Sequence, residues 1–338
     1  MKQFPDPITP SSLSHVSGET ALQWMKIKSA DVEWPPLIAH LEELGTKTHE
    51  NNPITRNYIV SPTKKGEHRI TASSVVKAFS GLAGSGYTYF QIDNSLRLVD
   101  YREVLWSEVK EPEDYKLHPD FLHPFSSQLR HGEFSAHLTT RKDIVVMNDC
   151  GLVASKRRTS WHLYDVLTFK NFIADVIDSY RVGCNLFDMV FDLSYRRHGA
   201  LLIFDPEGAV AKNIANRGSL FSSGVEVDAP REILRHAVNG ISLSSASLKA
   251  RKKRLLLELA SVDGAILFDE RSVLGFGCIV QSHPSAGSHD GARTTAAHSA
   301  FLWGGKPFKI SADGDITVLF HSPDKDGTTQ HSAETTFL

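Results

Sequence analysis

Hydrophobic positions in the second half of the chain follow two periods, one typical of helices and one typical of strands. Helical spacing of apolar side chains marks 166–182, at Leu167, Phe169, Phe172, Ile173, Val176, Ile177 and Tyr180. A second helix is expected at 184–196, and the continuous apolar run that follows at 200–204 is typical of a buried strand. Further strands are predicted at 265–268, 275–280, 306–310 and 315–320, with a helix at 292–303. Strands that alternate with helices over 183–322 predict an α/β fold, in which a mixed, twisted sheet is flanked by helices.

The first half of the chain has shorter elements, separated by polar turns. Residues 1–18 are rich in Pro, Ser and Thr and predict a loose arm, and 36–45 predicts a helix that begins with proline and ends with glycine. Strand-like segments follow at 58–60, 134–139, 143–147, 152–155 and 161–164. These patterns predict an arm and helix at 1–50, an α+β region of unassigned role at 51–182, the α/β domain at 183–322 and a C-terminal tail at 323–338.

Composition excludes several classes of protein. The 338 residues include 37 basic and 39 acidic side chains, so no overall positive field favours a nucleic-acid polymer. The three cysteines are widely spaced, which argues against a disulfide framework and a thiolate zinc site. The chain begins without an apolar signal segment and has no apolar run of membrane-spanning length. A cytoplasmic protein that does not associate with membranes is expected.

Two short motifs carry the candidate chemistry. Asp263-Gly264-Ala265 stands at the start of a predicted strand, where a carboxylate can reach a metal or a hydroxyl while the glycine lets the backbone approach a ligand. Gly291-Ala292-Arg293-Thr294-Thr295-Ala296-Ala297 places a glycine and an arginine before a helix. Free N–H groups, a helix dipole and a guanidinium suit a phosphate. Together the motifs predict a nucleotide site that includes Gly264, Ala265, Gly291, Arg293, Thr294 and Thr295.

In this order the motifs resemble those of the diadenylate cyclase (DAC) domain family, which includes the N-terminal domain of the DNA-integrity scanning protein. The resemblance covers 183–322 and begins with His198-Gly199-Ala200-Leu201-Leu202-Ile203. Asp263-Gly264-Ala265 matches the family's Asp-Gly-Ala motif, and the run from Gly291 falls on its Gly-Thr-Arg-His-Arg-x-Ala motif. The strand predicted at 315–320 fits the closing strand of the family.

The resemblance implies a specific chemistry. Active family members bind one ATP per subunit, and two facing subunits join two ATP molecules into cyclic di-AMP and pyrophosphate. A Mg²⁺ or Mn²⁺ ion bridges the phosphates. By this resemblance Asp263 would be the catalytic residue that serves the metal and the ribose hydroxyl, and the arginine motif would hold phosphate. The implied ligands are ATP or a cyclic dinucleotide, and a homodimer would be required for activity.

The arginine motif departs from the family at three positions. Arg293 is retained, but Thr294 replaces the histidine, Thr295 replaces the second arginine and Ala292 replaces a threonine. Removing one such transition-state contact costs roughly 3–4 kcal/mol, so binding can survive where turnover does not. The first hypothesis is therefore a nucleotide sensor with a degenerate phosphate motif, and the alternative is an active diadenylate cyclase. A third hypothesis, a scaffold with an empty pocket, is opposed by the retention of Asp263 and Arg293.

Other residues are candidates to supply the positive charge that the histidine and the second arginine provide in the family. His289 and His298 flank the motif, and Lys306 and the basic run 249–254 are further candidates, although the run also fits a solvated helix face. Asp290-Gly291-Ala292 repeats the Asp-Gly-Ala spelling without a following strand, so Asp290 is expected in a loop. The glycine-rich segment Gly81–Gly86 lacks the Gly-Lys-Ser/Thr ending of a phosphate loop and predicts a flexible turn.

Overall fold

A computed structural model describes residues 9–28, 32–70, 87–109, 117–221, 229–238, 241–244, 250–287, 289–323 and 330–337. The segment Gly81–Gly86 and Lys249 lie outside the described residues. The chain separates into two compact units. We call Ser12–Val166 the N-terminal unit, and Leu167–Leu338 together with Met1–Ser11 the C-terminal unit.

The N-terminal unit is built on a sheet whose described strands follow the order β10-β9-β8-β7-β3-β5-β6-β4. Its strands are β3 (Arg56–Val60), β4 (His68–Arg69), β5 (Thr88–Ile92), β6 (Arg97–Glu103), β7 (Phe134–Leu138), β8 (Ile144–Asn148), β9 (Gly151–Arg157) and β10 (Ser160–Leu163). A separate pair consists of β1 (Thr48–His49) and β2 (Asn52–Pro53). Strands β3 and β5 are parallel, and the connection between them contains β4, which pairs with β6 at the far edge of the same sheet.

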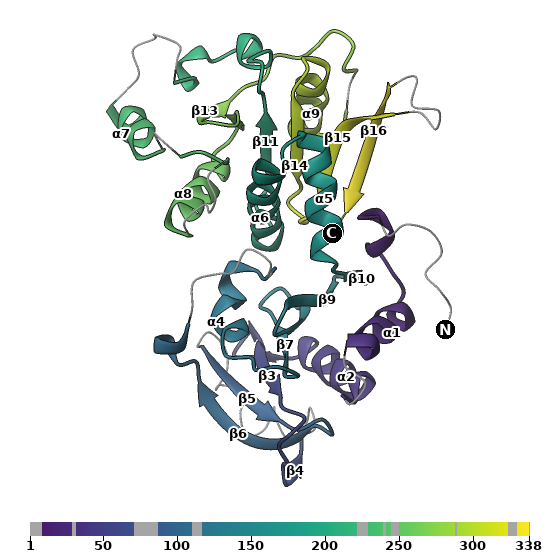
Figure 1. The fold of residues 1–338 in the computed structure, drawn as a ribbon. Helices are drawn as coiled ribbons and strands as arrows, with labels where there is room; N and C mark the ends of the chain where they lie inside the picture. Colours follow the sequence, from purple (N-terminus) through teal and green to yellow (C-terminus); the bar gives the residue numbers. More distant parts are fainter. Residues whose placement is uncertain are drawn as a thin grey trace. The chain divides into compact units, whose positions relative to one another are not determined.

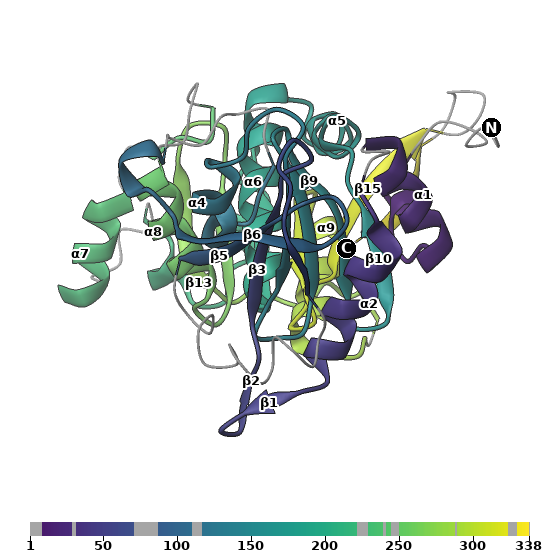
Figure 2. The same cartoon turned by 90° about the horizontal axis from the view of Figure 1, so that it is seen from below.

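Two helices pack on the half of this sheet that consists of β7, β8, β9 and β10. Helix α1 (Gly18–Lys28) packs on β9 and β10, and α2 (Trp34–Gly45) packs on β7 and β8 (Figure 2). The shorter helices are η1 (Ser11–Leu13), η2 (Trp106–Glu108), η3 (Asp120–Leu122) and α4 (His123–Ser126). Leu13 is buried and Val16 pairs with Trp161 of β10, so the described part of the predicted arm 1–18 is attached to the sheet. The prediction of a loose arm is wrong there, because Leu13 and Val16 supply apolar anchors among the polar residues.

The C-terminal unit contains a mixed sheet with the order β13-β12-β11-β14-β15-β16. Its strands are β11 (Ala200–Phe204), β12 (Ala265–Phe268), β13 (Val273–Cys278), β14 (Lys306–Ile310), β15 (Ile316–Pro323) and β16 (Gln330–Phe337). Strands β11 and β12 are parallel, whereas the other neighbouring pairs are antiparallel. The two parallel strands therefore begin at the same edge of the sheet.

Helices lie on both faces of the C-terminal sheet (Figure 1). Leu201 and Ile203 of β11 share a buried cluster with Ala297, Ala300 and Phe301 of α9 (Ala292–Leu302), which therefore covers one face. Helices α5 (Val166–Ile177) and α6 (Tyr180–Arg196) cover the other face. The remaining helices are α7 (Ala229–Val238), α8 (Ala250–Ala260), η4 (Ala211–Asn213) and η5 (Arg217–Ser219). The unit is a mixed α/β sheet flanked by helices, as the sequence predicts.

The boundaries of the C-terminal unit differ from the prediction at both ends. The unit begins at Leu167 rather than at 183, because Phe172 of α5 contacts Phe320 of β15 and Phe337 of β16 with ring centroids 5.3 and 6.0 Å apart. The predicted tail 323–338 contains β16, which pairs with β15 along its length. Both segments belong to the unit because they complete one aromatic core. None of the helices that the structure describes combines the length and the hydrophobicity needed to cross a bilayer.

Candidate functional site

Asp263 stands at the edge of the C-terminal sheet where β11 and β12 begin. Its side chain is 101% exposed, so the carboxylate is directed to solvent rather than into the core. Gly264 follows with a φ of +108°, and a Cβ atom at this position would lie 2.5 Å from the carbonyl carbon of Gly277. Glycine is therefore required for the chain to approach β13 here. This close approach fixes the backbone position of Asp263, just before β12 begins.

Arg293 lies in the first turn of α9, which starts at the same edge. Gly291 is the N-cap residue, with a φ of +95°, and no side chain caps the helix. The first N–H groups of a helix have no carbonyl partner within it, and the helix dipole makes this end attractive to anions. The predicted phosphate motif thus adopts the helix start that its sequence indicates.

The structure brings the two predicted motifs together. The Nη2 atom of Arg293 lies 3.4 Å from the Oδ1 atom of Asp263, although the residues are thirty positions apart. A third segment joins them, because a Cβ atom at Gly199 would lie 2.5 Å from Nη1 of Arg293. The starts of β11, β12 and α9 therefore meet around one guanidinium. Since Arg293 is 41% exposed and Asp263 fully exposed, the ion pair adds little to stability and can exchange with a ligand.

The two threonines that replace the family's histidine and arginine have different surroundings. The Oγ1 atom of Thr294 accepts a hydrogen bond from Nζ of Lys309 at 3.4 Å. The hydroxyl of Thr295 donates instead to the carbonyl oxygen of Gly291, at 3.4 Å. Thr294 therefore belongs to a cationic part of the site, whereas Thr295 closes the first turn of the helix.

Lys309 is the residue of this site that sequence reasoning missed. It lies on β14 opposite Leu201 and therefore on the face that α9 covers. Lys306, which the sequence offered as the replacement cation, is three residues away and so lies on the opposite face. Its ammonium is 6.0 Å from the ring centroid of Phe204, and burial lowers the pKa of Lys306. The expectation for Lys306 is thus wrong, and the strand period of two could have identified Lys309.

The histidines near the motif pack against each other. The rings of His289 and His298 stack with centroids 3.8 Å apart and an interplanar angle of 10°. Burial and the nearby charge of His289 lower the pKa of His298, and the charge of Lys309 acts in the same direction. Glu334 opposes this effect, with Oε2 3.9 Å from Nε2 of His298. In the absence of a ligand, these surroundings therefore disfavour a positive charge on His298.

The basic run before the Asp-Gly-Ala motif serves the contact between two helices. Nζ of Lys253 lies 2.6 Å from Oδ2 of Asp192, whose side chain on α6 is buried. Another ion pair, between Arg196 and Glu258, also links α6 to α8. These contacts favour a structural role for Lys253. Asp290 is exposed in the bend before α9 and outside any strand, as expected from the sequence.

Exposed apolar side chains lie next to Asp263. Val262, in the turn before β12, is 45% exposed, and Ile279, directly after β13, is 56% exposed. Asn216 fixes the second strand end, because its Oδ1 accepts the N–H of Ile279 at 2.8 Å and its Nδ2 donates to the carbonyl of Gly277 at 2.9 Å. This edge of the sheet thus combines apolar surface, a carboxylate and an arginine.

The residues at this edge fit a divalent cation only if the ion also binds to phosphate oxygens of a ligand. Among the described residues, no group of three or more His, Cys, Asp or Glu side chains could hold a metal. Asp263 offers one exposed carboxylate, and Mg²⁺ commonly binds one or two carboxylates together with the phosphates of a substrate. Asp263 could therefore contribute one ligand to a Mg²⁺ or Mn²⁺ ion that arrives with a phosphate-bearing ligand.

Comparisons with known proteins give a structural likeness. No protein-family model matches the chain, and no curated protein matches it. Among solved structures, a double mutant of DacA from Staphylococcus aureus is 18% identical over 44% of this chain and 83% of that chain, with a TM-score of 0.26. A hypothetical membrane spanning protein from Bacillus cereus is 15% identical over 49% of this chain and 74% of that chain, with the same TM-score of 0.26. At these values the likeness assigns neither an activity nor a role to any residue.

Proposed function

We propose that the C-terminal unit binds a nucleotide, either ATP or a cyclic dinucleotide, and acts as a sensor of that ligand. One observation carries the proposal: Arg293 and Asp263 meet at 3.4 Å beside Gly199, at the uncapped start of α9. A guanidinium and helix N–H groups recognise phosphate, and a carboxylate recognises a ribose hydroxyl or a metal ion. The resemblance of the same residues to DAC motifs supports the same ligand.

Each residue has a defined task in this proposal. Arg293 exchanges its exposed contact with Asp263 for phosphate oxygens, while Lys309 and the hydroxyl of Thr294 add further donors. Gly264, Ala265 and Gly291 provide backbone without bulky side chains, and Thr295 keeps the first turn closed. Val262 and Ile279 offer apolar contacts to a nucleobase. A Mg²⁺ or Mn²⁺ ion bound with the nucleotide would be held by Asp263 and would neutralise phosphate charge.

A sensor explains the residues better than a cyclase does. Arg293 is the only charged side chain that remains of the family's Arg-His-Arg run, and Thr295 donates to the backbone of its own helix. A neutral hydroxyl stabilises a leaving pyrophosphate less than a guanidinium does. Binding contacts to base, ribose and one phosphate need none of the missing residues. We therefore assign the site to recognition rather than to turnover.

One observation favours the second candidate, an active diadenylate cyclase. Lys309 supplies a positive charge at Thr294 from a different element. A lysine in this place could stabilise part of the charge that a histidine stabilises in the family. Cyclisation would additionally require two copies of the chain with facing sites, so its rate would rise with the square of protein concentration at low occupancy of the homodimer.

Nucleotide binding tests the proposal directly. Titration calorimetry with ATP and with cyclic di-AMP, each with Mg²⁺, is expected to show binding that Arg293→Gln weakens by about tenfold or more, because a charge-assisted contact is lost. Arg271→Gln is the matched control, since Arg271 is exposed in the β12–β13 connection at the other end of those strands. Equal affinities of the wild type and Arg293→Gln would contradict the proposal.

The same preparation distinguishes a sensor from an enzyme. Incubation with ATP and Mn²⁺ followed by mass spectrometry is expected to show no cyclic di-AMP. Product that disappears in Asp263→Ala and in Lys309→Met would establish the cyclase instead. Binding without product would support the sensor, and the absence of both would leave a scaffold.

A further inference from the structure

The N-terminal unit contains a cavity whose lining residues are separate from those of the proposed nucleotide site. Its volume is about 320 Å³, and its walls come from β3 and the loop after it, from β5, from β6 and the following η2, and from the segment before β7. Basic side chains on three of these segments line it, namely Lys64, Arg102 and Arg130. Ile59, Tyr89 and Leu105 add apolar surface. This volume is at the lower end of the range for sites that bind small molecules.

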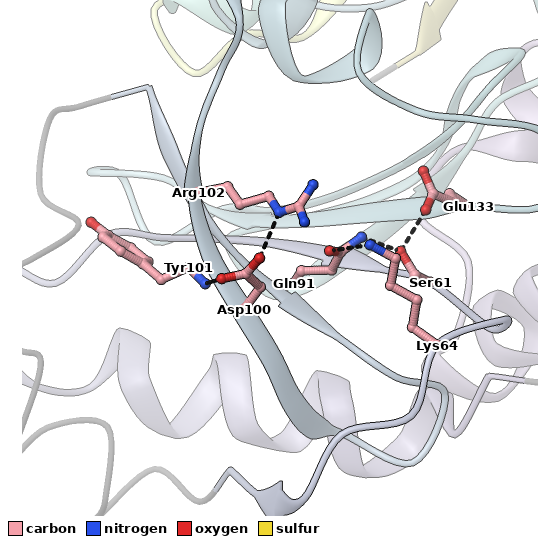
Figure 3. Close-up of polar contacts among 7 residues, drawn as sticks. All are labelled: Ser61, Lys64, Gln91, Asp100, Tyr101, Arg102 and Glu133. Carbon is pink, nitrogen blue, oxygen red and sulfur yellow. Dashed lines mark hydrogen bonds and ion pairs between the residues drawn. The ribbon is translucent and has the colours of Figure 1, made fainter.

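A directed chain of hydrogen bonds forms one wall of the cavity (Figure 3). Lys64 Nζ donates to Oε1 of Gln91 at 2.8 Å, and Nε2 of Gln91 donates to Oγ of Ser61 at 2.7 Å. Ser61 then donates to Oε1 of Glu133 at 2.5 Å. The backbone N–H of Arg130 donates to the other oxygen of Glu133 at 3.0 Å. Gln91 and Ser61 are buried, so the direction of every bond in the chain is fixed by its neighbours.

This chain of hydrogen bonds occupies the side-chain oxygens of Gln91 and Glu133, so the groups that remain to contact a ligand are N–H donors. Gln91 presents its oxygen to Lys64, and both oxygens of Glu133 accept a bond. The ammonium of Lys64 keeps its remaining N–H groups, and within the described residues the guanidinium of Arg130 has no ion-pair partner. An anionic group that enters the cavity would satisfy these donors.

Arg102 and Tyr89 extend the donor surface. Nε of Arg102 donates to Oδ2 of Asp100 at 2.8 Å, which orients the guanidinium (Figure 3), and a second side-chain hydrogen bond joins Arg102 to Tyr89. Burial raises the pKa of Tyr89, so its phenol stays protonated and can donate. A carboxylate is the anionic group that suits an arginine fork of this kind.

Three acidic side chains balance the three cations of the cavity, and besides Glu133, whose two oxygens already accept hydrogen bonds, two of them remain to contact an occupant. Glu103 and Glu108 also line the cavity, and both are exposed. They would repel a polyanion such as a nucleoside triphosphate, but they offer acceptors to an ammonium group. We propose that this cavity binds a free α-amino acid, with its carboxylate held by Lys64, Arg102 and Arg130 and its ammonium by Glu103 and Glu108.

Thermal unfolding and calorimetry test this proposal on the full-length chain. A pool of the twenty protein amino acids is expected to raise the melting temperature, and calorimetry with each one then identifies the ligand. Lys64→Met and Arg102→Gln are expected to weaken its binding by about tenfold each. Lys65→Met is the matched control, because it removes the same charge from the adjacent exposed residue, which does not line the cavity.

Further arms separate the alternatives. Arg293→Gln is expected to leave amino-acid binding unchanged, so failure of the nucleotide proposal would not affect this one. Inorganic phosphate is the competing probe: if it binds in a Lys64-dependent manner and no amino acid does, the proposal is overturned. It is equally overturned if no amino acid binds, or if binding persists in Arg102→Gln. Arg102 is exposed, so misfolding would not account for a loss of binding in that variant.

Discussion

At the scale of single residues, the candidate site depends on two glycines, because a side chain at either position would collide with a neighbouring segment. Gly199 lets the guanidinium of Arg293 lie against the start of β11, and Gly264 lets β12 approach β13 beside Asp263. Neither glycine supplies a side chain to the site, yet each one determines where a neighbouring functional side chain lies. Sequence reasoning recognised Gly264 from its motif, but the partner of each glycine is distant in the chain and becomes visible only in the fold.

Replacing Gly264 by alanine tests this dependence. Gly264→Ala places a Cβ 2.5 Å from the backbone of Gly277 at a φ of +108°, so β13 must shift. Gly287→Ala is the control, because Gly287 also has a positive φ, of +69°, but has open space around it. The control is expected to lose roughly 1 kcal/mol of unfolding free energy and Gly264→Ala roughly 2 kcal/mol more. Equal losses in chemical denaturation would contradict the close approach.

At the scale of elements, the last strand completes the core of the C-terminal unit. Phe337 of β16 is fully buried, and its ring centroid lies 5.3 Å from that of Phe169 and 6.0 Å from that of Phe172. Most of the other described side chains of this strand are partly or fully exposed. One buried aromatic residue among polar residues therefore decides where the strand packs.

Truncation of that ring gives the second stability prediction. Phe337→Ala is expected to lower the free energy of unfolding by roughly 3–5 kcal/mol, because a buried ring and its contacts are lost. Tyr180→Ala serves as the comparison, since Tyr180 is 61% exposed in the same unit and should change stability by less than about 0.5 kcal/mol. Denaturant titration measures both variants, and a small loss for Phe337→Ala would restore the prediction of a tail.

Elements with a strong period were predictable, and those with mixed patterns were not. The apolar runs of β11 and β12 end where the sequence predicts, because buried strands next to helices are apolar on both faces. Helix α1 was overlooked although Ser17 Oγ accepts the N–H of Thr20 at its start and Ala21, Trp24 and Met25 are buried at helical spacing. The polar edge strand β16 has no such pattern, because pairing with β15 rather than hydrophobicity holds most of it.

The sequence predicts the two motifs of the candidate site but not Lys309, the lysine that contacts Thr294. Asp263 and Arg293 follow from short sequence patterns; the parallel pairing of β11 with β12 brings Gly199 and Asp263 to one edge, and Arg293 reaches it from the start of α9. Lys309 has no motif, and its position depends on the antiparallel register that sets it opposite Leu201. Such registers join residues that are more than one hundred positions apart, so local patterns do not contain them.

At the scale of the whole molecule, the two units differ in their buried histidines. His40, His137 and His162 all belong to the N-terminal unit and are buried. Burial lowers the pKa of His40 to about 4 and the pKa of both His137 and His162 to about 3. These three rings therefore stay neutral in the folded unit at pH values where an unfolded chain would protonate them.

This difference predicts an acid-sensitive N-terminal unit. Below the unfolded pKa of 6.5 the unfolded chain binds more protons than the folded unit does, so stability falls as the pH drops from about 6.5 towards 4 and does not change above that range on account of these groups. Tryptophan fluorescence reports this unit, which holds the buried Trp24, Trp34 and Trp161. Denaturation midpoints at pH 7.5 and pH 5 measure the effect.

Two variants separate histidine from general acid effects. His40→Gln is expected to reduce the loss of stability between pH 7.5 and pH 5, because it removes one of the three neutral rings. His49→Gln, at an exposed position, is expected to leave that loss unchanged. A midpoint that is independent of pH in the wild type would show that the buried rings do not govern acid unfolding.

The exposed pair of Asp263 and Arg293 has a consequence for the kinetics of ligand capture. Opposite charges 3.4 Å apart cancel each other at distances beyond the Debye length, which is about 8 Å at physiological ionic strength. A nucleotide in solution therefore experiences little long-range attraction from these two residues, and their contribution begins only after contact, when the pair opens. The site would therefore discriminate among anions through their dissociation rates rather than through their association rates.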